Sequence, residues 1–310
     1  MRKKRKFYSG VLNHVYQRSL NGVNLFYEDE DFLVFYTIFS VCVRSSDVEA
    51  LMLCIMFNHF HALLRARSVQ GLSEFMDRFT SWFVRDFNYS IGRKGKLLKK
   101  NYGSAPKWTE KSVRSTINYI GNNPVEKGLC ARAEEFRWNF LAYFYSDHPF
   151  SEPIYRDRAS KPMRRALKEV DAMNQMNLPL KHAQLRRLFR ALSLVEKQQI
   201  IDYIISQYFS FDRDSLMAYY ASYEAMLAAM QSNTGSEHEI REEWSPESDT
   251  VFNDLIDWVH ARWPEMGARS VIMLEDDAKK TLVRELLHQT SASENQLLKF
   301  FHLPNEQSGA

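Results

Sequence analysis

The sequence is poor in the features that mark secreted, disulfide-linked or membrane-spanning proteins. It has three cysteines, an odd count without CxxC spacing, which argues against a disulfide framework and a cysteine-rich zinc module. No apolar run approaches the roughly 18 to 20 residues of a membrane helix. The basic start lacks the apolar core of a secretion signal, and no internal repeat is present. We therefore expect a soluble, cytoplasmic protein with no membrane partner.

The numbers of basic and acidic residues are also nearly balanced. Lys and Arg number 41 against 38 Asp and Glu, a formal charge of +3, which permits a nucleic-acid partner without requiring one. Hydrophobic residues make up 45% of the 310 residues and aromatics 14%, ample for packed cores. The length predicts two or three domains.

Apolar periodicity in the first half alternates between strand and helix patterns. We expect a strand at 8–18, a helix at 28–46, a central strand or hairpin pair at 48–66, a helix at 69–89, a strand with irregular flanks, and a helix from 111 that ends at Pro124. This alternation predicts an α+β fold with a small antiparallel sheet in a domain spanning residues 1–150.

The second half has a mostly helical pattern. We place a helical domain at 151–235, then a polar, acidic linker around 231–249 and a helical segment within 236–310. Residues 277–303 form two apolar-periodic helices, with Ser293 as a helix N-cap. This pair suggests a helix-turn-helix, and an ordinary helical hairpin is the alternative.

A histidine pair, His59 and His61, closes an apolar run. On a strand the two imidazoles share one face while Phe60 points to the other. Imidazole binds divalent metal ions, and such an ion can polarise a phosphoryl oxygen. If the strand is unbroken, Cys54 lies on the opposite face and is not a third ligand. A structural pair or a zinc site is the alternative.

Two stretches resemble a known family. Met56 to Leu64 (MFNHFHALL) resembles the signature of the HUH endonucleases, named for their histidine-hydrophobic-histidine pair. Asn118 to Leu129 (NYIGNNPVEKGL) resembles the tyrosine motif of single-tyrosine HUH transposases, especially the REP-associated tyrosine transposase group. The strings NHVYQR and NGVNLFYEDEDF add to the similarity, which covers about the first half. Phe57 departs from the commonest pattern, which has proline there, and the C-terminal half has no counterpart.

The resemblance implies a ferredoxin-like antiparallel sheet with the histidine pair on a central strand. It implies that Tyr119 attacks a DNA phosphate from a nearby helix, and that His59 and His61 hold Mg or Mn. Asn123 takes the place of a polar third ligand, although Pro124 makes a helix cap the alternative. His14 either faces this site or is a core histidine. The implied activity is DNA cleavage and strand transfer through a phosphotyrosine intermediate, in a transposase or a domesticated relative.

Basic and aromatic residues cluster between the second helix and the tyrosine motif. Such a mixture suits single-stranded DNA, because cations neutralise phosphates and rings stack on bases. The predicted DNA-binding residues are Arg18, Arg93, Lys94, Lys96, Lys99, Lys100, Lys107, Trp108 and Lys111. Basic stretches at 156–165 and 181–190 could extend the contact to the stem of a hairpin. A solvated surface is the alternative for each.

Two competing functions remain at this point. One is a DNA-binding regulator that keeps the fold without turnover, and the other is a hydrolytic zinc enzyme. The expected partner is single-stranded or hairpin DNA, in particular repeat elements, and both a monomer and a homodimer are consistent with the sequence.

Overall fold

One antiparallel sheet organises the first half of the chain in the computed structural model, which describes residues 9–232 and 247–304. Its strands are β1 (Leu12–Arg18), β2 (Val48–Met56), β3 (His59–Ala66) and β4 (Gly103–Lys107). They lie in the order β2-β3-β1-β4, and each neighbouring pair is antiparallel. The chain order β-α-β-β-α-β is that of ferredoxin-like folds. The predicted α+β class is confirmed, and 48–66 is a hairpin.

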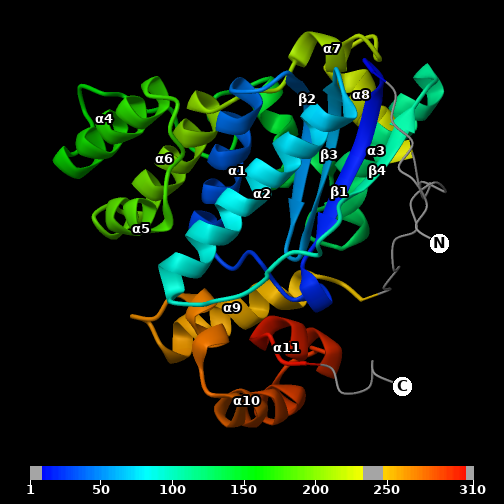
Figure 1. Cartoon of the computed structure of the whole chain (residues 1–310). Helices are drawn as coiled ribbons and strands as arrows, with labels where there is room; N and C mark the ends of the chain where they lie inside the picture. Colours follow the sequence, from blue (N-terminus) through cyan, green and yellow to red (C-terminus); the bar gives the residue numbers. More distant parts are fainter. Residues whose placement is uncertain (1–8, 233–246, 305–310) are drawn as a thin grey trace, which may run out of the picture.

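Two long helices, α1 (Asp29–Arg44) and α2 (Val69–Ile91), cover one face of the sheet (Figure 1). Three acidic residues in the first turn of α1 complement the helix dipole. Ser68 caps α2 by accepting a hydrogen bond from the Gly71 amide at 2.9 Å. The helix ends at Gly92, whose φ of 73° is a left-handed conformation that glycine adopts without strain.

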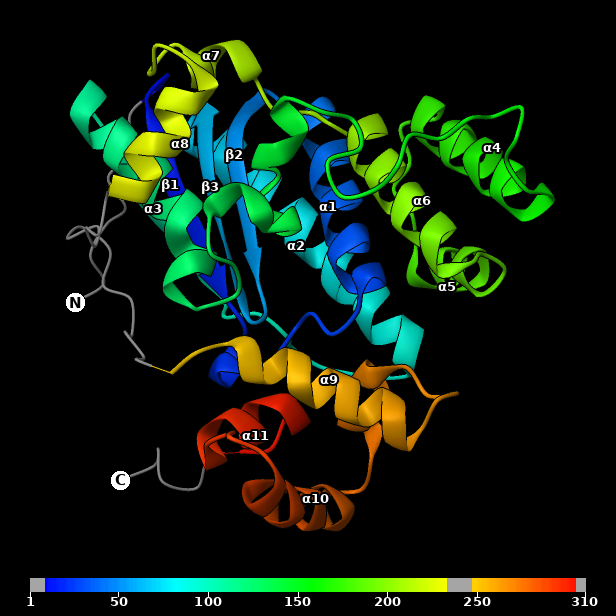
Figure 2. The same ribbon diagram turned by 180° about the vertical axis from the view of Figure 1, so that it is seen from behind.

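The opposite face of the sheet is covered by α3 (Glu110–Glu126) and α8 (Tyr223–Ser232), seen from behind in Figure 2. The two helices come from different halves of the sequence. Gly121 of α3 allows their close approach, because a Cβ there would stand 2.6 Å from the sulfur of Met230 on α8. The second half thus supports the helix that carries Tyr119.

The remaining part of the chain is helical, as predicted. Its other helices are α4 (Lys161–Gln175), α5 (His182–Arg190), α6 (Leu194–Gln207), α7 (Arg213–Met217), α9 (Thr250–Arg262), α10 (Asp276–Gln289) and α11 (Glu294–Phe301). Ser160 caps α4 by accepting from the backbone N–H of Met163 at 3.1 Å. Of the predicted linker, residues 233–246 lie outside the described residues.

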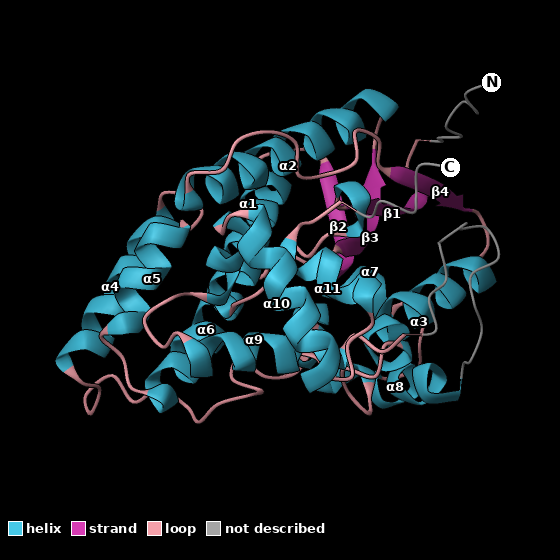
Figure 3. Ribbon diagram, turned by 90° about the horizontal axis from the view of Figure 1, so that it is seen from below, coloured by secondary structure: helices cyan, strands magenta, loops and turns pink. Residues whose placement is uncertain are grey.

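These helices form two groups around the sheet domain. Helices α4 to α6 pack beside α1, while α9 to α11 lie across one end of the sheet (Figures 1 and 3). Tyr36 donates to the carbonyl of Ile205 at 2.9 Å, and Tyr27 donates to that of Phe300 at 2.6 Å. The apolar core runs on through all three parts, so the predicted division at 150 and 235 stays a prediction. No helix in the described residues is both long and apolar enough to cross a membrane.

The terminal helix pair α10 and α11 has the predicted N-cap, because Ser293 accepts from the Gln296 amide at 3.2 Å. Along α11 only Glu294 is fully exposed, and the rest is buried or half-buried. The backbone N–H of Asn24 donates to the carbonyl of Lys299 at 3.1 Å, which fixes α11 against the sheet domain. Recognition of duplex DNA by this pair stays a prediction.

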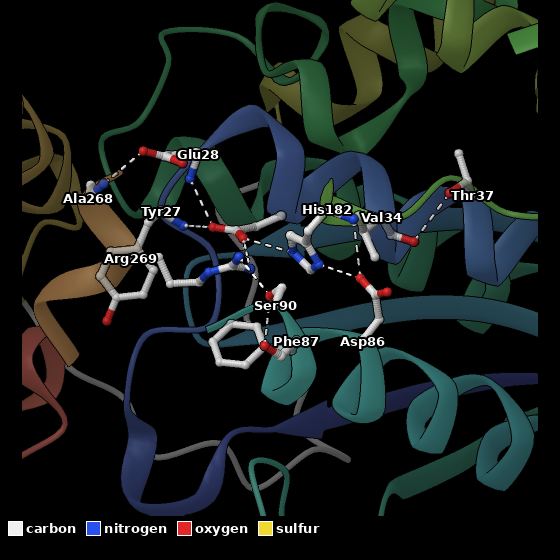
Figure 4. A network of polar contacts seen from close by, with 11 residues as sticks. Tyr27, Glu28, Val34, Thr37, Asp86, Phe87, Ser90, His182, Ala268 and Arg269 are labelled. Atoms are coloured by element: carbon white, nitrogen blue, oxygen red, sulfur yellow. Dashed lines mark hydrogen bonds and ion pairs between the residues drawn. The ribbon is translucent and has the colours of Figure 1, made fainter. Parts of the chain in front are cut away.

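A buried network of charges joins the three parts of the molecule (Figure 4). His182 of α5 contacts Asp31 of α1 at 3.0 Å through one ring nitrogen and Asp86 of α2 through the other. Both nitrogens can donate only in the imidazolium form. Arg269, between α9 and α10, also pairs with Asp31 and donates to Ser90 at 2.9 Å. Burial opposes ionisation of Asp31, but Arg269 and His182 outweigh it and hold its pKa below the usual range.

Candidate functional site

The β2–β3 hairpin places His59 and His61 on one face of the sheet. A turn at 57–58 separates the two strands, and β3 begins at His59. Side chains alternate along a strand, so Phe60 enters the core on the other face. The ring centroids of the two histidines are 5.0 Å apart. Both residues lie on β3, an inner strand of the sheet, and are buried, with exposed fractions of 4% and 0%.

Neighbouring side chains orient both imidazole rings. Asn58 donates from Nδ2 to the carbonyl of Gly22 at 3.1 Å, so its Oδ1 can accept from His59 Nδ1 at 2.6 Å. This bond leaves the lone pair on His59 Nε2. His61 Nδ1 lies 3.0 Å from Nε2 of His14, a residue of β1. Partners on one ring nitrogen commonly aim the other at a metal ion, so His14 faces the site.

Helix α3 brings Tyr119 to the same place. The Tyr119 ring centroid lies 5.5 Å from that of His61 and 5.6 Å from that of His14. Tyr119 and Asn123 are four residues apart and therefore share one face of the helix, the face toward the sheet. Tyr119 exposes 7% of its surface and His61 none. A phosphate therefore reaches them only after the side chains over them move.

The predicted end of this helix at Pro124 is wrong. Helix α3 continues to Glu126, and Asn123 lies inside it instead of capping it. Proline removes one backbone donor, but the following bonds still form. Lys127 donates from its amide to the carbonyl of Asn123 at 3.3 Å, and Leu129 donates to that of Pro124 at 2.9 Å. The loss is small because the proline stands in the last turn and packing holds both sides of the helix.

The side chain of Asn123 completes a set of donors that fits a divalent metal ion. Its Nδ2 lies 3.5 Å from His61 Nε2, and its Oδ1 is buried with no hydrogen-bond partner. Exchanging the amide atoms by a flip turns the oxygen toward His61. The described residues contain no group of three or more His, Cys, Asp or Glu placed to hold a metal. A metal here would therefore use His59, His61 and the Asn123 amide, and both the ion and its ligands stay predictions.

Cys54 faces the same side as His61, which corrects the expectation drawn from an unbroken strand. The hairpin turn reverses the chain, and the register pairs Cys54 directly with His61. Directly paired residues in antiparallel strands share a face. Burial raises the pKa of the Cys54 thiol well above its usual value. The Cys54 sulfur lies 3.8 Å from that of Met56, two residues along the same strand.

Most of the predicted DNA-binding residues lie on the surface. The exposed ones are Lys94, Lys96, Lys99, Lys100, Trp108 and Lys111. Lys107 is 4% exposed. Arg93 is half-buried and donates to Asn88 Oδ1 at 3.0 Å and to the carbonyl of Lys96 at 2.9 Å. Arg93 therefore holds the loop in this structure, and Lys107 is buried at the end of β4.

The loop between α2 and β4 brings part of this basic surface to the histidine end of β1. Lys99 donates from its amide to the carbonyl of Arg18 at 2.9 Å, and Gln17 Nε2 donates to the carbonyl of Lys99 at 2.7 Å. Arg18 pairs in register with His59 and so shares its face of the sheet. Cations from two segments thus lie at the end of the sheet where the His59 ring stands.

Side chains from the second half brace α3, and sequence reasoning missed them. Asn122 Nδ2 donates to the carbonyl of Met230 at 2.5 Å, and the Tyr220 hydroxyl donates to Asn118 Oδ1 at 2.8 Å. Asn58, which orients His59, was also missed. The sequence MFNHFHALL contains Asn58 beside the first histidine, whereas nothing in it signals the contacts to α8.

Comparisons with known proteins add a single remote likeness. No protein-family model matches the chain, and no curated protein matches it. One solved structure, described as the structure of the REP-associated tyrosine transposase bound to a REP hairpin, matches with a TM-score of 0.39 and 16% identity. The match covers 46% of this chain and 84% of the other. Likeness at this level carries no argument about function.

Proposed function

We propose that the protein cleaves and rejoins single-stranded or hairpin DNA through a covalent bond to Tyr119, as a transposase or a domesticated relative. One observation supports this most strongly. Two histidines on β3, His59 and His61, lie on the same face of the sheet as Tyr119 of α3. The ring centroids of Tyr119 and His61 are 5.5 Å apart. The resemblance of the two motifs to HUH transposases supports the same function.

The chemistry requires activation of a weak nucleophile. A phenol of pKa near 10 is ionised to only about a thousandth at pH 7. A metal ion held beside the ring would favour loss of the phenol proton by stabilising the phenolate. The Tyr119 oxygen would form a bond to phosphorus while the bond to the departing 3′ oxygen breaks and that oxygen takes up a proton. A 3′-hydroxyl can later attack the phosphotyrosine and restore a phosphodiester.

A divalent ion, Mg or Mn, fits this scheme. His59, His61 and Asn123 would hold it, and when bound it would supply positive charge against the phosphoryl oxygens. The protein's own contribution is to fix the rings. Asn58 and His14 hold His59 and His61 through their Nδ1 atoms, and α3 holds Tyr119 above them.

The DNA strand would approach across the basic loop between α2 and β4. Its exposed lysines would neutralise phosphates, and Trp108, 57% exposed, would stack on a base. Tyr89, at the end of α2, is 86% exposed and offers a second ring. Together these groups favour a single strand, whose bases are free to stack, over an intact duplex.

The burial of His61 and Tyr119 favours a second candidate function, that of a DNA-binding regulator. His61 has no exposed surface and Tyr119 has 7%, which also suits a DNA-binding regulator that no longer turns over. The two candidates differ in one outcome, because only the enzyme forms a covalent bond to DNA.

Incubation with labelled hairpin-containing single strands and Mn tests the proposal. The enzyme is expected to form a denaturation-resistant adduct that is lost with chelator and in Tyr119→Phe. Tyr155→Phe is the matched control, since Tyr155 is 61% exposed and lies in the segment before α4, which starts at Lys161. Tight binding without an adduct would favour the regulator. Cleavage that persists in Tyr119→Phe would indicate a hydrolytic metal enzyme.

A further inference from the structure

Two adjoining hollows lie between the α5–α6 pair and the segment from α9 to residue 270, away from Tyr119. The inner hollow, about 580 Å³, is lined by the start of α1, by Phe32 and Trp138, and by α9. The outer hollow, about 560 Å³, is lined by α5 and by residues 262–267. Arg186 and Arg190 line both hollows, so the two form one cleft.

The outer hollow is basic. Arg186, Arg190 and Arg262 line it, against one acid, Glu265. Arg186 and Arg190 stand four residues apart on α5 and are exposed, and no carboxylate of the described residues lies within ion-pair distance of either. Like charges at this spacing destabilise a helix, and a bound anion would offset the repulsion. Half-buried Trp263 lies at the same wall.

The inner hollow has the opposite character, with carboxylates beside an aromatic wall. Phe32 and Trp138 stack in that wall, with centroids 4.5 Å apart and planes 9° from parallel. Glu28 is engaged by His260 at 3.2 Å. The carboxyl of Glu30 has no side-chain partner at hydrogen-bond or ion-pair distance among the described residues. Burial and the nearby Glu28 raise the pKa of Glu30 to about 7, and no side chain of the described residues donates to its carboxyl.

We propose that this cleft binds one nucleotide of a DNA single strand, with its base in the inner hollow and its phosphate against Arg186 and Arg190. This rests on the proposed function in taking DNA as the substrate. A base fits the aromatic wall, and an exocyclic amino group supplies the donor that Glu30 lacks. Cytosine offers such a group to a carboxylate, whereas thymine presents a carbonyl there. The cleft therefore favours cytosine over thymine.

Binding is measured on the full chain in the Tyr119→Phe background, so that cleavage plays no part. The probes are fluorescein-labelled dodecamers of dC and dT, titrated by anisotropy over a range of NaCl concentrations. Arg186→Ala with Arg190→Ala removes both cations that would hold the phosphate. Arg67→Ala with Arg78→Ala is the charge-matched control, because both arginines are exposed and lie by α2.

The cleft double variant is expected to lower the log–log salt slope by about 0.7, the contribution of one single-strand phosphate. Loss of that phosphate contact amounts to about fivefold in affinity at 0.1 M salt. The control pair should change both values little. Equal losses in the two double variants, or none in the cleft variant, would overturn the proposal.

Glu30→Gln tests the base. The parent should prefer the dC probe about fivefold or more, the lower limit of a good base contact, and the variant should lose most of this preference while keeping its salt slope. An unchanged preference refutes the base assignment. If the protein with Tyr119 intact forms the adduct but the cleft variants bind DNA as the parent does, only the cleft proposal is refuted. If the cleft variants weaken binding but no adduct forms, only the proposed reaction is refuted.

Discussion

Replacing Arg269 by Met probes the buried network that fastens the two helical groups to the sheet domain. The side chains of Arg269 and Asp31 are 3% and 2% exposed, so solvent does not compensate for the lost partner. Breaking such a pair typically costs about 3 to 5 kcal/mol, because the remaining charge stays buried. At about 2 °C per kcal/mol for a chain of this length, the melting temperature should fall by about 6 to 10 °C.

Arg262→Met is the matched control. Arg262 pairs with Glu285 at 3.3 Å, but the two side chains are 45% and 29% exposed, and exposed pairs contribute about 0 to 1 kcal/mol. Both variants are compared by chemical denaturation and by scanning calorimetry. Adding Asp31→Asn to the Arg269 variant should recover part of the loss, since it removes the buried charge that Arg269 no longer balances. A loss in Arg269→Met no larger than in Arg262→Met would refute the reasoning.

Three further perturbations test other parts of the account. His302, whose burial lowers its pKa to about 4, takes up its proton only on unfolding between pH 6.5 and 4. It should therefore contribute to an acid loss of about 3 kcal/mol across that window, and denaturation of His302→Gln should show a flatter pH dependence. Gly103→Ala places a Cβ 2.2 Å from the Tyr16 ring, so it should cost about 1 to 3 kcal/mol by thermal denaturation, and an unchanged melting temperature would contradict this packing. Lys99→Ala with Lys100→Ala should lower the salt slope of single-strand binding by about 1.4 without altering stability, and an unchanged slope would remove the loop from the DNA path.

The small antiparallel sheet and the shared face of the two histidines could be predicted because they follow from local rules, whereas the approach of Tyr119 to them was only implied by the resemblance to HUH transposases. Alternation along a strand placed His59 and His61 together, and helical spacing placed Tyr119 and Asn123 on one face. The end of α3 was mispredicted because the rule about proline is local, whereas the packing of α8 on Gly121 is not.

Other features depend on contacts that periodicity does not encode. The stretch KHAQLRRLFR looked like a basic surface, yet its His182 is buried between two carboxylates. Those partners, Asp31 and Asp86, lie 151 and 96 residues away. Arg186 and Arg190 in the same stretch do reach the surface, and only the folded arrangement shows the cleft they share.

The most direct test of the central claim is to identify the residue that becomes attached to DNA. Tryptic digestion of the adduct, followed by mass spectrometry, isolates the peptide Ser115–Lys127, in which Tyr119 is the single tyrosine. The account predicts a 5′-phosphate-linked nucleotide on Tyr119 in this peptide. A nucleotide on any other tyrosine-containing peptide, or cleaved DNA with every peptide unmodified, would contradict it.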